Sequence, residues 1–335
     1  MPLHNIIKGE RFFKYAREGF LYKALHEITH QVKSRVYAFL SKYIRSLLYG
    51  EVLREDERFI VLIFDVEEDL DFYSELYYNS FKYIDSGAFN DLISLLDDLD
   101  ICATFYITPQ VAEHLNDMIK ESLLNTHSLG VHLHPHNVVR VNYPFYSRSI
   151  IDHLSLYKYD EKLTMMQRAK SRIERVLDRK IFLFRSGRLC CDDEIEKIAS
   201  ILGYKAISNH RYTYYIKPLK IWNLDAGKHD LFVLLLKHGY KPLVKCITKS
   251  TEKIIALPGH PMRLYNYQRG KIISHLLSTF SSFIKTMIKE GNVHFIDQYR
   301  LLLLLERRLK MNTLGCEPGH NDFNDYGLLK YNSIK

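Results

Sequence analysis

The short stretch "GVHLHPHNV", residues 130–138, holds three of the 16 histidines in the chain: His132, His134 and His136. His132 and His136 are four residues apart, and Pro135 restricts the turn between them, so both imidazoles could reach one ion. His134 lies between them and could replace either as a ligand or act from outside the coordination shell. A hydrogen-bonded surface turn is the alternative, because an isolated His-x-x-x-His is a weak signal.

A pair of carboxylates ends an apolar run in "FIVLIFDVEED". A strand alternates its faces, so Asp65 and Glu67 point to the same side. Two like charges at one place repel each other unless a cation lies between them. One carboxylate, two imidazoles and water suit Zn²⁺, with Co²⁺, Ni²⁺ or Mn²⁺ as alternatives. A solvated loop is the other interpretation.

Two further groups end apolar runs, Arg185 in "FRSGR" and His260 in "LPGHPM". An arginine keeps its charge, so Arg185 beside Asp65 would hold that carboxylate ionised and oriented. His260 could donate a proton to a leaving group. A surface salt bridge and a capping histidine are the alternatives for these two residues.

The elements that must position these groups alternate along the chain. Strand patterns such as "RFIVLIFD", "CATFYI", "LGVHLH", "IFLFR" and "KIIALPGH" are separated by helical patterns, among them 111–124, 160–178 and 271–289. This order predicts a mainly parallel α/β sheet or barrel, in which the chemistry collects where strands end. The run "LFVLLL" is short enough to be a buried strand.

The order of these motifs resembles the polysaccharide deacetylase family, the NodB-homology domain of carbohydrate esterase family four, over roughly residues 58–300. The resemblance implies an irregular (β/α) barrel, seven-stranded and TIM-like. It also implies that Asp65 is the catalytic base, that Arg185 tethers it, and that His260 is the general acid. The implied metal ligands are the side chains of Glu67, His132 and His136.

The chain departs from the family pattern in three places. The first motif is D-V-E rather than D-D-G, and Arg185 is followed by Ser186 and Gly187 where R-x-P is usual. For the fourth motif, an Asp-and-Trp element, the candidates are Trp222 and Asp225 in "IWNLDAG", as contacts to the substrate or to the metal ligands.

The expected activity is metal-dependent hydrolysis of an N-acyl group, in the first place N-acetyl, on an amino sugar or glycan that could be lipid-linked. Two alternatives stay open: a related hydrolase of a non-sugar amide or imide bond, and a degenerate barrel that binds carbohydrate without turning it over.

Charge and pattern divide the chain into three parts. Residues 1–50 hold nine Lys/Arg against three Glu, so most of the net charge of +8 belongs to them. We expect a basic amphipathic helical segment over 1–55, a barrel over 56–310 and a polar tail over 311–335. The segment could lie on an anionic membrane surface, or pack on the barrel or on a second subunit. A nucleic-acid partner is not expected, because the body is almost neutral.

The five cysteines are scattered and form no C-x-x-C pair, which favours reduced thiols and gives no support for a thiolate zinc site. No apolar run reaches the roughly 18 residues that span a bilayer, and the first residues lack the apolar core of a signal peptide. We therefore expect a cytoplasmic protein, at the inner membrane surface if the basic segment binds there.

Overall fold

The computed structural model describes residues 53, 57–71, 76–77, 80–138, 153–210, 213–291 and 293–313. The predicted basic segment lies outside these residues apart from Leu53, and so does the tail beyond Thr313. The predicted division into three parts therefore stays a prediction. None of the described helices combines the length and the apolar character needed to cross a membrane.

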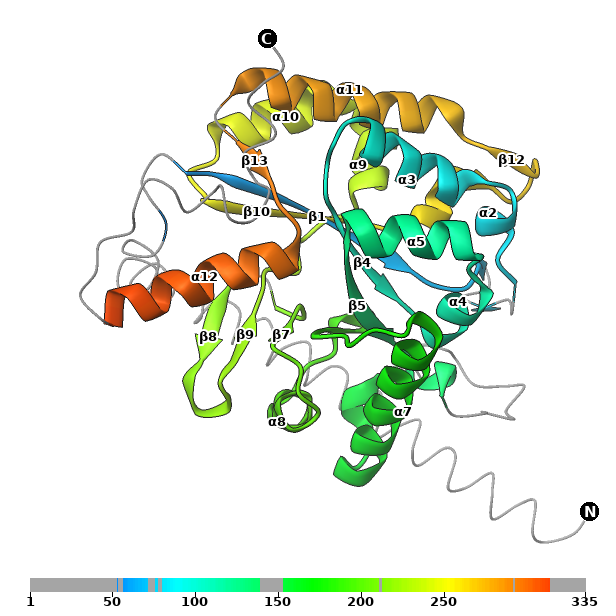
Figure 1. Ribbon diagram of the computed structural model, residues 1–335. Helices are drawn as coiled ribbons and strands as arrows, with labels where there is room; N and C mark the ends of the chain where they lie inside the picture. Colours follow the sequence, from blue (N-terminus) through cyan, green and yellow to red (C-terminus); the bar gives the residue numbers. More distant parts are fainter. Residues whose placement is uncertain are drawn as a thin grey trace, which may run out of the picture.

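The centre of the molecule is a curled, mainly parallel sheet (Figure 1). Its strands lie in the order β10 (Ile254–Gly259), β1 (Phe59–Val66), β4 (Thr104–Ile107), β5 (Ser128–Leu133), β6 (Leu183–Ser186), β7 (Ala206–Ile207), β9 (Ile221–Asn223) and β8 (Tyr214–Ile216). The first seven run parallel, and β8 joins β9 antiparallel. Strand β13 (His294–Phe295) pairs with the start of β1. This is the irregular (β/α) barrel that the sequence predicted.

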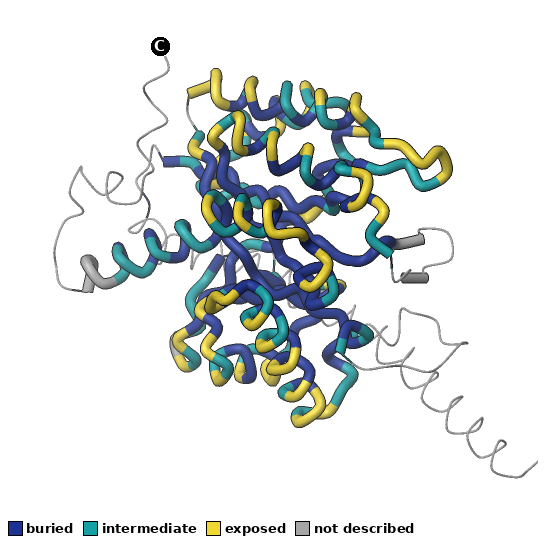
Figure 2. Tube along the Cα trace, turned by 45° about the vertical axis from the view of Figure 1, so that its right-hand side comes forward, coloured by how far each residue is buried: buried dark blue, intermediate teal, exposed yellow. Residues whose placement is uncertain are grey.

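The outer face of the sheet is covered by helices, whose exposed residues are yellow in Figure 2. In chain order they are α2 (Lys82–Asp85), α3 (Ala88–Asp98), α4 (Pro109–His114), α5 (Asp117–Thr126), α7 (Tyr159–Leu177), α8 (Asp193–Ile201), α9 (Leu231–His238), α10 (Tyr240–Lys249) and α11 (Ser274–Glu290). The even-numbered residues of β1, from Ile60 to Val66, belong to the core that these helices form with the sheet.

The inner face has its own smaller core. The odd-numbered residues of β1, from Phe59 to Ile63, pack there with Trp222 and with leucines of the last helix, α12 (Gln298–Thr313). Because a strand alternates its faces, the same side of β1 continues into Asp65 and Glu67. In the same way, Gly130 of β5 abuts the ring of Tyr106, and His132 continues that inner face.

Helix α12 crosses beside the strands β8 and β9 and below β1 and β10 in Figure 1. Among the described residues the two ends of this strand order, β8 and β10, are not paired with each other, so the barrel is open between them. Gln298 at the start of α12 bridges this region, because its Nε2 donates to Ser208 Oγ and to the Asp225 carbonyl oxygen, each at 3.1 Å. The helix therefore closes the concave side of the sheet.

Short turns and hairpins complete the fold. The 3₁₀ turns are η1 (Pro135–Asn137), η2 (Leu154–Leu156), η3 (Gly187–Leu189), η4 (Lys217–Leu219) and η5 (Pro261–Leu264). The small hairpins are β2 (Leu70–Asp71) with β3 (Leu76–Tyr77), and β11 (Tyr265–Asn266) with β12 (Lys271–Ile272).

The expectation that "LFVLLL" is a strand is wrong, because these residues form α9. The local reason is the residue before the run: the Asp230 side chain accepts a hydrogen bond from the Val233 backbone N–H and caps the helix. A short apolar run does not by itself distinguish a strand from a buried helix.

Candidate active site

Asp65 and Arg185 meet at the carboxyl edge of the sheet, from the ends of β1 and β6. Arg185 Nε donates to Asp65 Oδ2 at 3.0 Å and lies 2.8 Å from Oδ1. The other end of the guanidinium donates to the Ser208 carbonyl oxygen and side chain and to the Ala226 carbonyl oxygen. Both charged side chains are buried, so the guanidinium fixes the direction in which the carboxylate points.

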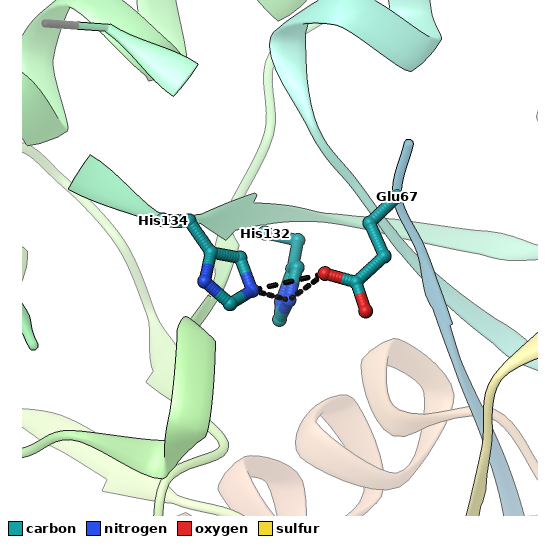
Figure 3. Close-up of side chains that lie close together, drawn as sticks. All are labelled: Glu67, His132 and His134. Atoms are coloured by element: carbon teal, nitrogen blue, oxygen red, sulfur yellow. Dashed lines mark hydrogen bonds and ion pairs between the residues drawn. The ribbon is translucent and has the colours of Figure 1, made fainter. Parts of the chain in front are cut away.

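Glu67, His132 and His134 form a compact buried cluster beside this pair (Figure 3). His134 Nε2 lies 3.0 Å from Glu67 Oε2 and 3.1 Å from His132 Nε2. His132 Nε2 is 3.8 Å from the same carboxylate oxygen. Two imidazole nitrogens and one carboxylate oxygen therefore face one small volume.

The sequence prediction placed His136 in this cluster and His134 outside it, and the structure reverses the two. His134 has extended backbone angles (φ −100°, ψ 140°), so it continues the alternation of β5 and shares a face with His132. His136 lies in the 3₁₀ turn η1, and its Nε2 is 3.3 Å from Asn137 Nδ2. The spacing of four residues would need a turn that returns the chain to the same face, and η1 does not provide it.

Gly187 provides the space that the His134 ring occupies. A Cβ atom at residue 187 would lie 2.4 Å from the ring atoms Cε1 and Nδ1 of His134. Any larger residue there, including the proline usual in the resembled family, would push against the ring. The His134 ring can therefore occupy this position because the chain has glycine at residue 187, where R-x-P would place proline.

The electrostatics of the cluster favour charged Glu67 and neutral His132. Burial opposes ionisation of Glu67, but the hydrogen bond from His134 and the nearby imidazoles outweigh it and lower the pKa of the carboxyl. Burial lowers the pKa of His132 to about 4. An ionised carboxylate and a neutral imidazole are the forms that bind metal.

The donor set fits a divalent ion. Bonds of about 2.0–2.2 Å to nitrogen and oxygen in a tetrahedral shell place neighbouring donors roughly 3.3–3.5 Å apart, and the three separations in this cluster run from 3.0 to 3.8 Å. Glu67, His132 and His134 would hold the ion, with one face of the shell left for water or substrate.

His260 approaches the cluster from the end of β10. Its Nε2 lies 3.9 Å from Asp65 Oδ2 and 3.8 Å from Glu67 Oε1, and its side chain is 32% exposed. Its Nδ1 lies 2.6 Å from Asp230 Oδ2, which also accepts from Arg263 Nε at 2.9 Å. Burial opposes protonation, but the hydrogen bond with Asp230 and the surrounding carboxylates raise the pKa of His260 above its usual value.

Asp230 was not among the residues that the sequence motifs indicated. The candidates for the fourth motif were Asp225 and Trp222, whose side chains make other contacts. The Asp225 side chain accepts from the Gly227 N–H in its own loop, and Trp222 lies in the inner core against Tyr215. A helix-capping aspartate directly before an apolar helix is the signal that could have identified Asp230.

A buried network that the sequence analysis also missed holds η1 in place. Glu68 Oε1 accepts from Asn137 Nδ2 at 2.9 Å, and Asn137 Oδ1 accepts from the His134 N–H at 2.8 Å. Burial raises the pKa of Glu68. The network links the β1 loop to the histidine turn and so helps to fix His134.

The chain was then compared with known proteins. Residues 54–207 match the family model described as polysaccharide deacetylase. A comparison with curated proteins returned no match. Among solved structures, the chain is similar to a putative polysaccharide deacetylase from Mycobacterium smegmatis, with 13% identity and a TM-score of 0.51 over 79% of this chain and 93% of that chain.

Two other structures are similar in the same way. PuuE allantoinase gives 10% identity and a TM-score of 0.52 over 75% of this chain and 91% of that chain. Peptidoglycan deacetylase PdaC from Bacillus subtilis gives 12% identity and a TM-score of 0.43 over 78% and 98%. The likenesses to the Mycobacterium protein and to PuuE allantoinase show the fold alone.

The curled parallel sheet, with carboxylates and imidazoles gathered at its carboxyl edge, defines a NodB-type (β/α) barrel. Residues 54–207, a little under half of the chain, match the polysaccharide deacetylase family, the NodB-homology group of carbohydrate esterase family four, as the motifs indicated.

Proposed function

We propose that this protein is a metal-dependent deacetylase that removes the N-acetyl group from an amino sugar or glycan. The observation that carries the proposal is the convergence of a tethered carboxylate, Asp65, a metal-type cluster and an oriented imidazole, His260, within 4 Å of one another. The family match supports the reaction class. Zn²⁺ is the first candidate for the ion, with Co²⁺, Ni²⁺ and Mn²⁺ behind it.

Each side chain has a defined task in amide hydrolysis. A divalent ion held by Glu67, His132 and His134 would polarise the amide carbonyl and make water easier to deprotonate. Asp65 accepts the proton of the attacking water, and Arg185 keeps the carboxylate aimed at it. His260 protonates the departing amine, while Asp230 holds the imidazole so that Nε2 faces the site.

The proposal extends to the kind of substrate, which is either linked to a membrane lipid or soluble. A lipid-linked amino sugar fits a protein whose basic N-terminal segment binds the inner membrane surface from the cytoplasm. A soluble glycan fits the same barrel without membrane contact. Assembly into a homo-oligomer is compatible with either substrate.

The test is an assay of acetate release from N-acetylated sugars, peptidoglycan fragments and polyprenyl-linked N-acetyl sugars. Cyclic amides of the allantoin type are included because an allantoinase shares the fold. We expect release from at least one sugar, and Asp65→Asn should lower it at least about a hundredfold because an amide cannot accept the proton. Asp98→Asn, on the exposed end of α3, is the matched control.

Two outcomes would overturn the proposal. Hydrolysis of cyclic amides without acetate release would make the protein an amide or imide hydrolase of another class. Saturable sugar binding without turnover, at full metal occupancy, would make it a carbohydrate-binding barrel that has lost catalysis.

A further inference from the structure

A second group of metal-type side chains lies at the same edge of the sheet, outside the candidate active site. Cys191 follows η3, Glu196 lies in the first turns of α8, and His210 follows β7. Cys191 is buried, and the other two side chains are partly exposed, 16% for Glu196 and 28% for His210. Their donor atoms lie within 4.8 Å of one another.

The separations fit a zinc-type shell. Glu196 Oε1 lies 3.4 Å from His210 Nε2 and 3.8 Å from Cys191 Sγ. With bonds of about 2.3 Å to sulfur and about 2.0–2.2 Å to nitrogen and oxygen, tetrahedral geometry predicts roughly 3.4 Å between nitrogen and oxygen and roughly 3.6 Å between sulfur and oxygen. The two separations from Glu196 are thus close to those of a tetrahedral zinc shell, and the third pair, Cys191 and His210, lies within 4.8 Å.

The charges of the group also match a divalent ion. A thiolate and a carboxylate together carry two negative charges, and the neutral imidazole adds none. Without a cation, burial and the charge of Glu196 raise the pKa of the Cys191 thiol. A bound cation reverses this effect, because a coordinating thiol loses its proton.

A buried amide supports the thiolate side of the group. Asn209 is 1% exposed, and its side chain acts to lower the pKa of the Cys191 thiol against the effect of burial. Among the described residues, the buried Asn209 Nδ2 makes no hydrogen bond. Asn209 Oδ1 accepts from the Ser186 N–H at 2.9 Å, so the orientation of the amide is fixed. A hydrogen-bond donor facing the sulfur stabilises the metal-binding form of the ligand.

We propose that Cys191, Glu196 and His210 bind a second divalent cation of the zinc type, with water in the remaining position. The ion would join the loop after β6 to the loop after β7. Ser208, at the start of the second loop, accepts hydrogen bonds from Arg185, the tether of Asp65, and Arg185 itself lies near the end of β6, from which the first loop leaves. The site would therefore stabilise the frame of the catalytic base, and it does not depend on the reaction proposed above.

The experiment titrates the metal-free full-length protein with Co²⁺ and follows the near-ultraviolet thiolate-to-Co²⁺ charge-transfer absorption. The cluster of Glu67, His132 and His134 has no sulfur donor, so the band reports the second site alone. We expect two equivalents of Co²⁺ in the wild type, one of which produces the band. The doubly substituted Glu67→Gln/His132→Ala protein should keep the band and bind one equivalent.

Matched variants identify the sulfur. Cys191→Ser should abolish the band. Cys190→Ser, next to it and paired with His153 Nδ1 at 3.0 Å, and Cys246→Ser, an exposed thiol, should keep it. Glu196→Gln and His210→Ala change partly exposed side chains, and each should weaken Co²⁺ binding at this site at least tenfold while the circular dichroism spectrum is unchanged. The proposal is wrong if the folded wild type shows no band, if the band survives Cys191→Ser, or if both Glu196→Gln and His210→Ala bind Co²⁺ like the wild type.

Discussion

At the scale of single residues, the site depends on which imidazole faces Glu67. The contact of His134 Nε2 with the carboxylate at 3.0 Å makes His134 the candidate ligand, and the turn η1 directs His136 elsewhere. We expect His134→Ala to lower the affinity for Zn²⁺ at the catalytic cluster at least tenfold, because one of three protein donors is lost. The measurement is Zn²⁺ titration of the metal-free protein in a Cys191→Ser background.

His136→Ala is the matched control for this prediction, since it removes an imidazole two residues away. It should change the Zn²⁺ affinity much less than His134→Ala. Gly187→Ala should act in the same direction as His134→Ala, because the new methyl group would displace the His134 ring. Loss of metal with His136→Ala and retention with His134→Ala would restore the ligand pair that the sequence suggested.

The pair of Asp230 and His260 makes a prediction about pH. The hydrogen bond and the charge of Asp230 raise the pKa of His260, so the imidazole stays protonated to higher pH than a free histidine would. Asp230→Asn keeps the shape of the side chain and removes the charge. We expect the alkaline limb of the kcat/KM profile to move to lower pH, because the imidazolium then has a lower pKa and loses its proton at lower pH.

The control for Asp230→Asn is Asp225→Asn, a carboxylate in the preceding loop that accepts a hydrogen bond from the Gly227 N–H. It should leave the position of the alkaline limb unchanged. An unchanged limb in Asp230→Asn, with kcat lowered, would mean that Asp230 only holds the ring in place.

At the scale of elements, helix α12 is fixed to the beginning of β1 by a buried ion pair. Arg308 donates to Glu57 through Nη1 at 2.6 Å and Nη2 at 2.9 Å, and the two residues are 1% and 5% exposed. Arg308→Met removes both of these charged hydrogen bonds from a buried carboxylate. We expect it to lower the free energy of unfolding by about 3–5 kcal/mol, measured by urea denaturation.

The double variant Glu57→Leu/Arg308→Met separates the charge from the packing. It removes both charges and should recover most of the stability that Arg308→Met loses, because replacing a whole buried pair with apolar side chains costs little. Equal destabilisation in the single and double variants would show that packing of the arginine side chain, and not the unpaired charge, is what matters.

At the scale of the whole molecule, the uneven distribution of charge bears on where the protein works. We propose that the basic segment 1–50 draws the barrel to an anionic membrane, with each Lys or Arg near the surface contributing up to about 1 kcal/mol. We expect the full-length protein to co-sediment with anionic liposomes at low salt and to be released at high salt. Neutral liposomes are the control surface.

A triple variant tests the contribution of three basic side chains of the segment. Arg35→Gln, Lys42→Gln and Arg45→Gln together should weaken co-sedimentation and leave the apolar residues unchanged. Full-length protein that stays in the supernatant at both salts, or a triple variant that co-sediments like the wild type, would point instead to a helix that packs on the barrel or on a second subunit.

The sequence by itself determined the parts of this protein that depend on local pattern. Runs such as "FIVLIFD" specify buried strands, and strand alternation places Asp65 and Glu67 on one face. Because parallel strands end at one edge, the polar residues after β1, β5, β6 and β10 had to gather there. The sequence therefore predicted the barrel and the meeting of Asp65 with Arg185.

The tertiary structure decided what depends on side chains distant in the chain. Whether His134 or His136 faces Glu67 depends on where β5 ends and on the space that Gly187 leaves. Asp230 reaches His260 only because α9 begins beside the end of β10, and Cys191 meets His210 only because β6 and β7 are neighbours. Such contacts are set by packing between elements, and a one-dimensional pattern holds no distance between residues that lie far apart in the chain.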